Sequence, residues 1–75
     1  MTLAQFLTDL QDILQRDEPL TPETLLTGVE EWDSLAIMGC LAYFDRKFDV
    51  KTTFAQYQQV RTVTDLVAMV RDHVK

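Results

Sequence analysis

The 75-residue sequence contains one cysteine, one histidine and one serine, with two glycines and two prolines. A single cysteine, Cys40, cannot form an internal disulfide, and a small domain without disulfides is typical of a reducing compartment. One histidine and one cysteine far apart match no structural metal pattern. No apolar run approaches the roughly 18 residues of a membrane helix, and no basic segment of the kind that opens a signal peptide is present. We therefore expect a soluble, cytoplasmic protein without metal or membrane span.

Basic residues are also scarce. Twelve Asp and Glu oppose seven Lys and Arg, a formal net charge of −5, whereas nucleic-acid binders carry an excess of Lys and Arg. Residues 1–38 hold eight acids and one base, and residues 39–75 hold four acids and six bases. Two interpretations remain open: a solvated surface that keeps a small domain soluble, or an acidic patch around residues 30–33 that faces a partner.

The length predicts a single domain over residues 1–75. A chain this short buries only roughly 60% of its unfolded surface, so a deep cleft with a full catalytic apparatus would be hard to accommodate. Few glycines and prolines favour helix. We find no internal repeat and no long alternation typical of strands. Small size and negative charge favour a monomer.

The first expected helix has apolar residues on one face. They recur at helical spacing: Leu3, Phe6, Leu7, Leu10, Ile13 and Leu14. Thr2 with Gln5 fits a capping box at its start. Arg16 is expected in its last turn, near the negative end of the helix dipole.

Residues 17–33 lack a long apolar period. Thr21-Pro22-Glu23 provides a helix cap, a proline at the first helical position and an early acid, which together predict a short helical turn over 22–26. Gly28 is expected to free the backbone just after it. Three leucines are expected to cover the core: Leu20, Leu25 and Leu26.

A second helix is expected from Ser34, and residues 34–44 contain no charge. A helix that is apolar around most of its circumference is buried or meets a partner. One face carries Leu35, Met38, Leu41, Ala42 and Phe48, and a neighbouring face carries Ile37, Cys40 and Phe44. Gly39 costs up to about 1 kcal/mol against alanine. It indicates either close helix packing or access for a ligand or partner, and the two remain equal.

Two more helices follow. Thr53 with Gln56 is expected to cap a short third helix that carries Phe54 and Tyr57. A capping box of Thr62 and Asp65 starts the last helix, whose apolar stripe is Val63, Leu66, Val67, Val70 and Val74. The expected fold class is all-α: a small four-helix bundle with one short helix and a long connection after the first helix.

Catalysis by a serine nucleophile is weakly supported. Such a site needs the nucleophile, a base and an orienting group in contact. Ser34, His73 and Asp33 could be drawn as a minimal serine hydrolase, but no Gly-x-Ser-x-Gly motif supports this reading. His73 lies near the C-terminus, where a cation at a helix end is the simpler interpretation. We therefore expect that the protein is not an enzyme.

Ser34 follows Asp33 and opens the most apolar helix. In one interpretation, Ser34 or Asp33 caps this helix by accepting a hydrogen bond from an exposed backbone N–H. In the other, the hydroxyl is held at an exposed helix N-terminus, where backbone N–H groups suit a phosphate ester on its oxygen. From the residues alone, capping is favoured.

The segment Asp33-Ser34-Leu35 at the start of an uncharged helix resembles the phosphopantetheine attachment motif of acyl carrier proteins. The resemblance covers nearly the whole chain. A long helix, a long loop with a helical turn, the Asp-Ser-Leu helix, a short helix and a Thr-capped last helix follow the order of that family. The spacing from Ser34 through Phe48-Asp49 to Thr62-Val63 is similar to the family's as well.

The resemblance implies a non-catalytic carrier. A phosphopantetheinyl transferase would attach 4′-phosphopantetheine from coenzyme A to Ser34, and the thiol of that arm would hold an acyl or aminoacyl group as a thioester. The implied partners are a loading ligase or acyltransferase and synthase or tailoring enzymes. The reactive sulfur would belong to the cofactor, and Cys40 is expected to be a small apolar core residue.

The resemblance also implies sites of partner recognition. Asp33 would assist recognition by the transferase, Leu35 would anchor the helix start, and Ile37, Met38 and Leu41 would line the helix that borders the acyl chain. Trp32 stands where many family members have glycine, and it either packs over the bundle or contacts a partner.

The second helix departs from the pattern of typical fatty-acid carriers, in which acids on that helix dock basic patches. Here Asp45 is its only acid before Asp49. This favours a specialised polyketide, nonribosomal peptide or modified fatty-acid pathway over bulk lipid synthesis. The alternative is a helical interaction module without a prosthetic group, which would bind through residues 35–44.

Overall fold

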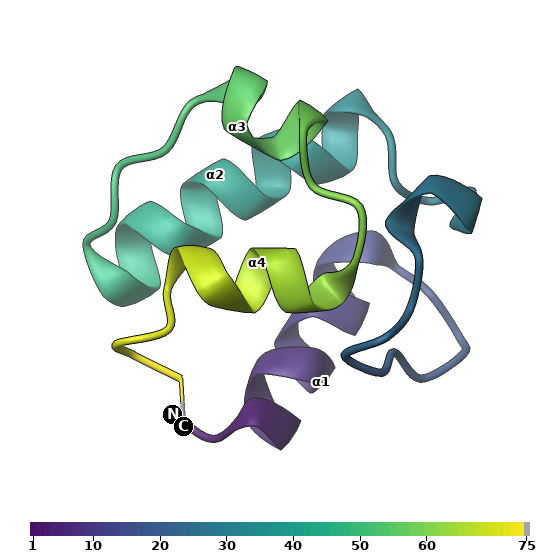
Figure 1. Cartoon of the computed structure of the whole chain (residues 1–75), viewed down its shortest axis with the longest axis horizontal. Coiled ribbons are helices and arrows are strands. Elements are labelled where there is room, and N and C mark those ends of the chain that lie inside the picture. Colours follow the sequence, from purple (N-terminus) through teal and green to yellow (C-terminus); the bar gives the residue numbers. More distant parts are fainter. Residues whose placement is uncertain (75) are drawn as a thin grey trace.

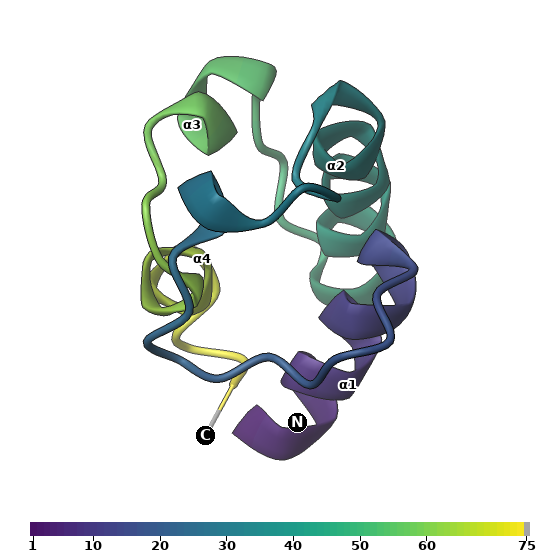
Figure 2. The same ribbon diagram turned by 90° about the vertical axis from the view of Figure 1, so that its right-hand side faces the viewer.

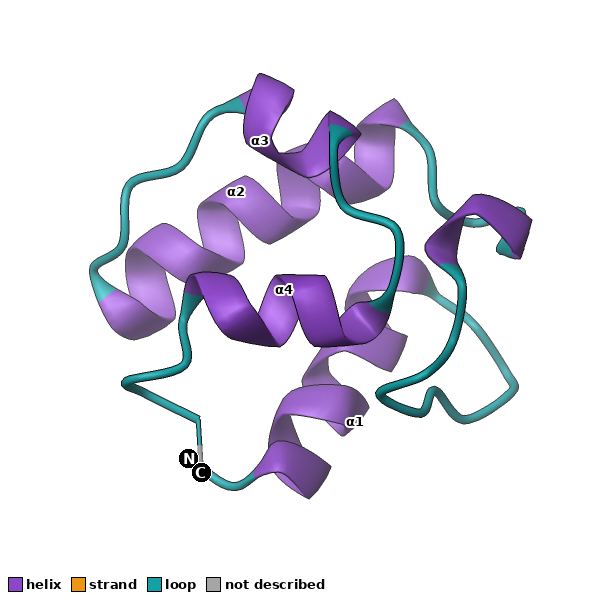
Figure 3. Cartoon of the chain, viewed as in Figure 1, coloured by secondary structure: helices purple, strands orange, loops and turns teal. Residues whose placement is uncertain are grey.

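The computed structural model describes residues 1–74, which form four α-helices and one short 3₁₀ helix (Figures 1 and 3). These elements are α1 (Leu3–Leu14), η1 (Leu26–Gly28), α2 (Ser34–Phe48), α3 (Phe54–Gln58) and α4 (Val63–Met69). Loops connect them, and no strand occurs in the described range (Figure 3). The predicted all-α class, with a short third helix and a long first connection, is confirmed. None of the described helices is long and apolar enough to cross a membrane.

Helix α2 is the longest element, and α1 packs against it, with its C-terminal end near the start of α2 (Figure 2). The start of the chain lies beside the last described residues (Figure 1). The ammonium group of Met1 donates a hydrogen bond to the carbonyl of His73, at 3.2 Å. The core is built only from apolar residues and tyrosine: Phe6, Leu10, Leu14, Leu20, Leu26, Val29, Ala36, Ile37, Cys40, Phe44, Phe48, Tyr57, Val60, Val63, Leu66, Val70 and Val74.

Aromatic side chains fill the middle of the core. The ring of Phe44 is fully buried and lies 5.7 Å from Tyr57, 5.9 Å from Phe48 and 6.1 Å from Phe6, measured between ring centroids. The rings are tilted or edge-on, which are favourable aromatic arrangements. The inward face of α2 is therefore the face that carries Cys40 and Phe44. Leu35 and Met38 point to solvent, whereas Phe48, which the sequence analysis placed on the same face, is buried, because thirteen positions along a helix turn it well away from Leu35.

The predicted caps form where the sequence indicated, but the first helix has only the Thr2 half of the expected capping box, whereas Thr53 and Thr62 form both halves. Thr2 Oγ1 accepts from the backbone N–H of Gln5 at 3.1 Å. The backbone N–H of Thr53 donates to the Gln56 side chain at 2.7 Å. At the start of α4, Asp65 Oδ2 accepts from the backbone N–H groups of Arg61 and Thr62 at 2.9 and 3.2 Å.

The Asp65 cap predicts a pH dependence of stability. The two backbone N–H groups hold the pKa of the Asp65 carboxyl below its ordinary value of 3.8. A lowered pKa in the folded state means that the carboxylate stabilises the fold above the unfolded-state pKa, and that this contribution is lost as pH falls through the folded-state pKa. We expect the free energy of unfolding, measured by urea titration, to fall as the pH is lowered from about 5 through the folded-state pKa of Asp65. The fall should be smaller in Asp65→Asn, and an identical pH profile in that variant would contradict the assignment.

The helical turn in the first connection lies later than predicted. Instead of 22–26, it spans Leu26–Gly28. Thr24 Oγ1 accepts from the backbone N–H of Thr21 at 3.0 Å, which forms a turn there. Next, the Leu26 N–H donates to the Arg61 carbonyl at 2.8 Å, and Leu25 pairs with Thr62 in an isolated antiparallel bridge. Because this pairing keeps the backbone extended, the helix cannot start before Leu26.

The same pairing overturns one expected core residue. Leu20 and Leu26 are buried as predicted, but Leu25 is 60% exposed. An extended backbone directs successive side chains to opposite sides. With Leu26 in the core, Leu25 must therefore face solvent. Gly28 was expected to use the wider conformational range of glycine. It does not, because its φ is not positive.

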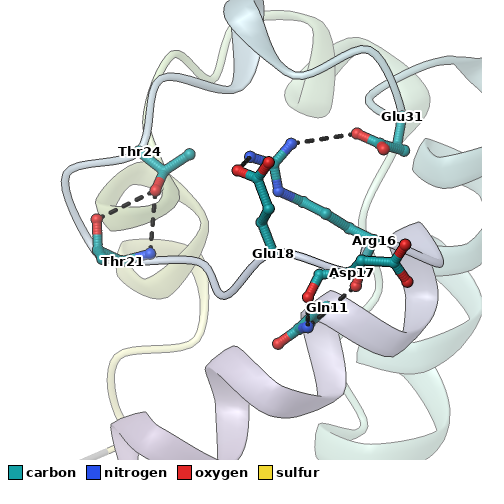
Figure 4. A network of polar contacts seen from close by, with 7 residues as sticks. All are labelled: Gln11, Arg16, Asp17, Glu18, Thr21, Thr24 and Glu31. Carbon is teal, nitrogen blue, oxygen red and sulfur yellow. Dashed lines mark hydrogen bonds and ion pairs between the residues drawn. The ribbon is translucent and has the colours of Figure 1, made fainter.

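Arg16 does not lie in the last turn of α1, contrary to expectation. The helix ends at Leu14, and Gln15 takes a left-handed conformation with φ of 55°. Arg16 then extends to Glu18 and Glu31, each at 3.2 Å (Figure 4). Its carbonyl accepts from the Gln11 side chain at 3.0 Å. Arg16 therefore holds the two ends of the long loop together rather than compensating the helix dipole.

Candidate functional site

Ser34 is the first residue of α2, and its side chain is exposed. The residue before it, Asp33, is the helix cap: its Oδ1 accepts from the backbone N–H of Ala36 at 2.9 Å. The Ser34 hydroxyl makes no hydrogen bond to any residue in the range 1–74. The two roles considered from the sequence, helix cap and free hydroxyl, thus fall to two neighbouring residues. Asp33 supplies the cap, and the hydroxyl of Ser34 is left free for other chemistry.

The surroundings of the Ser34 hydroxyl favour a negative group. The first turn of a helix exposes backbone N–H groups, and the helix dipole places partial positive charge there. Helix α2 is 15 residues long, so its dipole is well developed. Such a terminus suits an anion. Since Asp33 occupies only the N–H of Ala36 with its side chain, the arrangement is chemically suited to hold a phosphate ester on Ser34.

Two of the predicted recognition residues lie in the open beside this serine. Leu35 is 77% exposed and Met38 is 59% exposed, and they are the large apolar residues that α2 presents to solvent. Asp33 is exposed as well, and Trp32 is half-buried against the edge of the core. The packing interpretation of Trp32 is therefore correct for part of its surface, and the remaining part is accessible.

Ile37 differs from the expectation for a recognition residue. It is only 6% exposed and belongs to the core. Ile37 lies two positions after Leu35 and one before Met38. Because each residue of an α-helix turns by about 100°, the side chain of Ile37 cannot share their outward direction. The side chain of Ile37 therefore supports the fold from inside, and its role on the helix that borders an acyl chain stays a prediction.

Open grooves lie on both sides of the exposed ridge of α2. The larger has a volume of about 650 Å³ and lies between the end of α1 and the start of α2. It is lined by Ile13, Leu14, Gln15, Glu31, Asp33, Leu35, Ala36, Met38 and Gly39. We call it the α1–α2 groove. The smaller, of about 360 Å³, lies toward the loop after α2, where Lys51 pairs with Asp45.

Gly39 lies on the α1–α2 groove, where α1 and α2 approach closely. A Cβ atom at Gly39 would come within 3.0 Å of Cγ2 of Ile13. This distance is tighter than ordinary van der Waals contact, so glycine permits the close approach of the two helices. The close-packing interpretation of Gly39 is therefore correct, and access for a ligand or partner at the open surface beside it stays a prediction.

The remaining nucleophile and base are poorly placed for catalysis. Cys40 is fully buried, and desolvation raises the pKa of its thiol to about 12, so it stays protonated at neutral pH. The His73 ring packs on Phe48, with centroids 5.3 Å apart. Phe48 ends α2 and Ser34 begins it, about 20 Å away along the helix axis. Ser34 and His73 therefore do not form a catalytic pair.

Metal-binding clusters of His, Cys, Asp or Glu are also absent among residues 1–74. The arrangement around Ser34 therefore consists of an exposed hydroxyl at a capped helix N-terminus, a pair of apolar side chains and two open grooves.

The fold is shared with a solved structure. No protein-family model matches the sequence, and no curated protein matches it. A solved structure from Mycobacterium tuberculosis, assigned as an acyl carrier protein, superposes with a TM-score of 0.74 at 24% sequence identity. The match covers 92% of this chain and 95% of that one. This chain has the acyl carrier protein fold. The resemblance seen in the sequence is thereby confirmed at the level of the fold.

Within the acyl carrier protein fold, the serine of the Asp-Ser-Leu segment stands at the start of the second helix, as the sequence indicated. Sequence reasoning missed the lining of the α1–α2 groove by Ile13, Gln15 and Glu31. Glu31 was within the acidic patch predicted around residues 30–33. Ile13 and Gln15 gave no such signal, because their contribution depends on how α1 approaches α2.

Proposed function

We propose that this protein is a non-catalytic acyl carrier protein that receives 4′-phosphopantetheine on the hydroxyl oxygen of Ser34. The observation that carries the proposal is the division of roles at the start of α2. Asp33 caps the helix, so the adjacent Ser34 hydroxyl is exposed and unbonded at a helix N-terminus. The acyl carrier protein fold of the chain supports the same assignment.

Attachment would form one bond and break one. A phosphopantetheinyl transferase would join Ser34 Oγ to the phosphorus of the pantetheine phosphate, and the nucleotide half of coenzyme A would leave. The transferase would take up the proton of the hydroxyl. The protein's own contribution is positional. Asp33 fixes the start of α2, the backbone N–H groups of the first turn face the negative ester, and Leu35 and Met38 offer an apolar surface to the enzyme.

The arm, once attached, supplies a thiol that holds acyl or aminoacyl groups as thioesters. The fully buried Cys40 is unsuited to that task. Loading would fall to a ligase or acyltransferase, and unloading or modification to synthase or tailoring enzymes. We further propose a cytoplasmic monomer.

The character of α2 favours a specialised pathway, for polyketides, nonribosomal peptides or modified fatty acids. The outward surface near Ser34 carries Leu35 and Met38 rather than acids. Asp45, the first acid on this helix, is already paired with Lys51. A partner that docks through basic residues alone would find little charge to contact on this part of α2, so dedicated partners with apolar docking surfaces are expected.

The proposal is tested by the mass of the intact protein. The purified chain is incubated with coenzyme A and a broad-specificity phosphopantetheinyl transferase, and a known carrier protein serves as the control for transferase activity. We expect a mass gain of one phosphopantetheinyl group, which peptide mapping assigns to the peptide that contains Ser34. A gain on another residue, or no gain while the control is fully modified, would contradict the proposal.

A helical interaction module without a prosthetic group is the second candidate. The exposure of Leu35 and Met38 favours it, because large apolar side chains on a small domain mark contact surfaces. The same mass measurement separates the two candidates, since an interaction module would bind partners without ever gaining the arm.

A further inference from the structure

The smaller of the two grooves lies on the same side of α2 as Ser34. We call it the α2–Lys51 groove, and it is lined by Met38, Leu41, Ala42, Asp45, Lys51 and Thr52. At about 100° per residue, the directions of Met38, Leu41 and Asp45 differ from that of Ser34 by about 40° or less. Leu41 and Asp45 lie about 10 and 16 Å farther along the helix axis. A chain attached to the Ser34 hydroxyl can therefore follow α2 to this groove without crossing to another face of the helix.

The α2–Lys51 groove is small and partly polar. Its volume of about 360 Å³ is near the lower end of the range for ligand clefts, roughly 300–1,000 Å³. Met38 and Leu41 give it an apolar wall. The ammonium group of Lys51 pairs with the carboxylate of Asp45 and lies 3.9 Å from that of Asp49. Because two carboxylates share one ammonium group, they retain oxygens that can accept a hydrogen bond from a hydroxyl or an amino group.

The core behind the groove is closed by a hydrogen bond and two aromatic rings. Thr52 lines the groove, and its hydroxyl is hydrogen-bonded to the hydroxyl of Tyr57 at 2.7 Å. The Tyr57 ring is fully buried and lies 5.7 Å from the Phe44 ring, measured between centroids. An alkyl chain that entered the core here would have to separate the two hydroxyls and displace both rings. The first change leaves a buried hydroxyl unpaired and the second disrupts close packing, and both are unfavourable.

We infer that the arm on Ser34 carries a short acyl group with a hydroxyl or amino group, and that the α2–Lys51 groove holds this cargo outside the core. The inference rests on the proposed function, because it concerns the cargo of the same arm. The polar group donates a hydrogen bond to the carboxylate of Asp45, and the carbon atoms of the cargo lie against Met38 and Leu41. A long alkyl chain finds no equivalent place, because the groove is small and the core behind it is filled.

The cargo can be attached without a transferase. Ser34→Cys places a thiol at the exposed first position of α2, where an iodoacetamide with a linker of the length of the arm alkylates it. The sulfur–carbon bond forms, the carbon–iodine bond breaks, iodide leaves and the buffer takes up the thiol proton. Cys40 is fully buried, so we expect it not to react. The unaltered chain, in which Cys40 is the single cysteine, is the control for this selectivity.

Four linkers distinguish the cargo classes, and they end in alanyl, lactoyl, isobutyryl or octanoyl groups. Alanyl and lactoyl carry an amino group or a hydroxyl where isobutyryl has a methyl group. Amide chemical shifts of the ¹⁵N-labelled adducts are compared with those of the linker alone. We expect alanyl and lactoyl to shift the amides of Leu41, Asp45 and Lys51, and isobutyryl to shift them clearly less. Octanoyl is expected to leave the amides of Phe44 and Tyr57, and the melting temperature, unchanged.

A pair of matched variants tests the role of Asp45. Asp45→Ala removes the carboxylate from the groove, so the shifts that alanyl and lactoyl cause at Leu41 and Lys51 should fall to the level seen with isobutyryl. Asp12→Ala removes a carboxylate from an exposed position of α1 that does not line the groove, and the shifts should stay as in the unaltered groove. Circular dichroism establishes that both variants are folded.

Three results would overturn the inference. Octanoyl could shift the amides of Phe44 and Tyr57 and raise the melting temperature, because an alkyl chain inside the core buries apolar surface. Isobutyryl could shift the groove amides as much as alanyl and lactoyl do, or Asp45→Ala and Asp12→Ala could have equal effects. Shifts from only one of alanyl and lactoyl would support the inference and identify the polar group. Because the attachment is chemical, failure of a transferase to modify Ser34 leaves these results unaffected, so this inference and the proposed function fail separately.

Discussion

Replacement of Ser34 by alanine is expected to abolish addition of the phosphopantetheinyl group completely. The chain has one serine, and its hydroxyl oxygen is the atom that would form the new bond to phosphorus. Since that hydroxyl is exposed and makes no hydrogen bond to residues 1–74, its loss should change the free energy of unfolding by no more than about 0.5 kcal/mol. Intact mass after incubation with coenzyme A and transferase measures the first effect, and urea unfolding measures the second.

The chain offers a matched control for this variant. Thr27 is an exposed hydroxyl residue in η1, within the connection that precedes Ser34, and Thr27→Ala should be modified as fully as the unaltered chain. Loss of modification in both variants would point to a damaged transferase surface rather than to the attachment atom. Retention of the mass gain in Ser34→Ala would disprove the assignment of Ser34.

Replacement of Phe44 by alanine is expected to lower the free energy of unfolding by about 3–5 kcal/mol. The Phe44 ring is fully buried and lies within 6.1 Å of the rings of Phe6, Phe48 and Tyr57. Its removal leaves a cavity bordered by three aromatic residues that belong to α1, α2 and α3. Because domains have only about 5–15 kcal/mol of stability in total, the variant should unfold at a much lower urea concentration.

Phe54→Ala in α3 is the control for the Phe44 variant. Phe54 is half-buried at the edge of the core, so its truncation removes the same atoms from a site that water already reaches. We expect a clearly smaller loss of stability. Equal losses in the two variants would contradict the central position of Phe44. The urea midpoint, followed by far-ultraviolet circular dichroism, gives both values.

The helices and their starts were predictable because each depends on residues close in sequence. A threonine or aspartate that accepts a backbone N–H three residues later fixes a helix start locally, as Thr2, Asp33 and Thr62 show. The same locality explains why Ser34 could be placed at the start of α2. The choice between Asp33 and Ser34 as the cap was not decided by sequence, because both side chains are chemically able to accept that bond.

The first connection was predicted less well, since distant residues determine it. The sequence around Thr21-Pro22-Glu23 favours a helical turn, but Leu26 donates its N–H to the carbonyl of Arg61. That bond joins residues far apart in the chain. It moves the turn to Leu26–Gly28 and leaves Leu25 exposed. Arg16 is similar, because Glu31, one of its two partners, is supplied by the far end of the loop.

The amino-acid sequence by itself determined the all-α class, the order of the helices, the single free cysteine and the position of Ser34 beside Asp33 at the start of α2. These properties follow from composition and from local hydrogen bonding. Only the tertiary structure decided which face of the uncharged helix is buried, with Phe44 inside and Leu35 and Met38 outside. It alone also showed that Gly39 meets Ile13 beside an open groove. The physical reason is that an apolar helix has several faces of similar hydrophobicity, and packing against α1 selects between them.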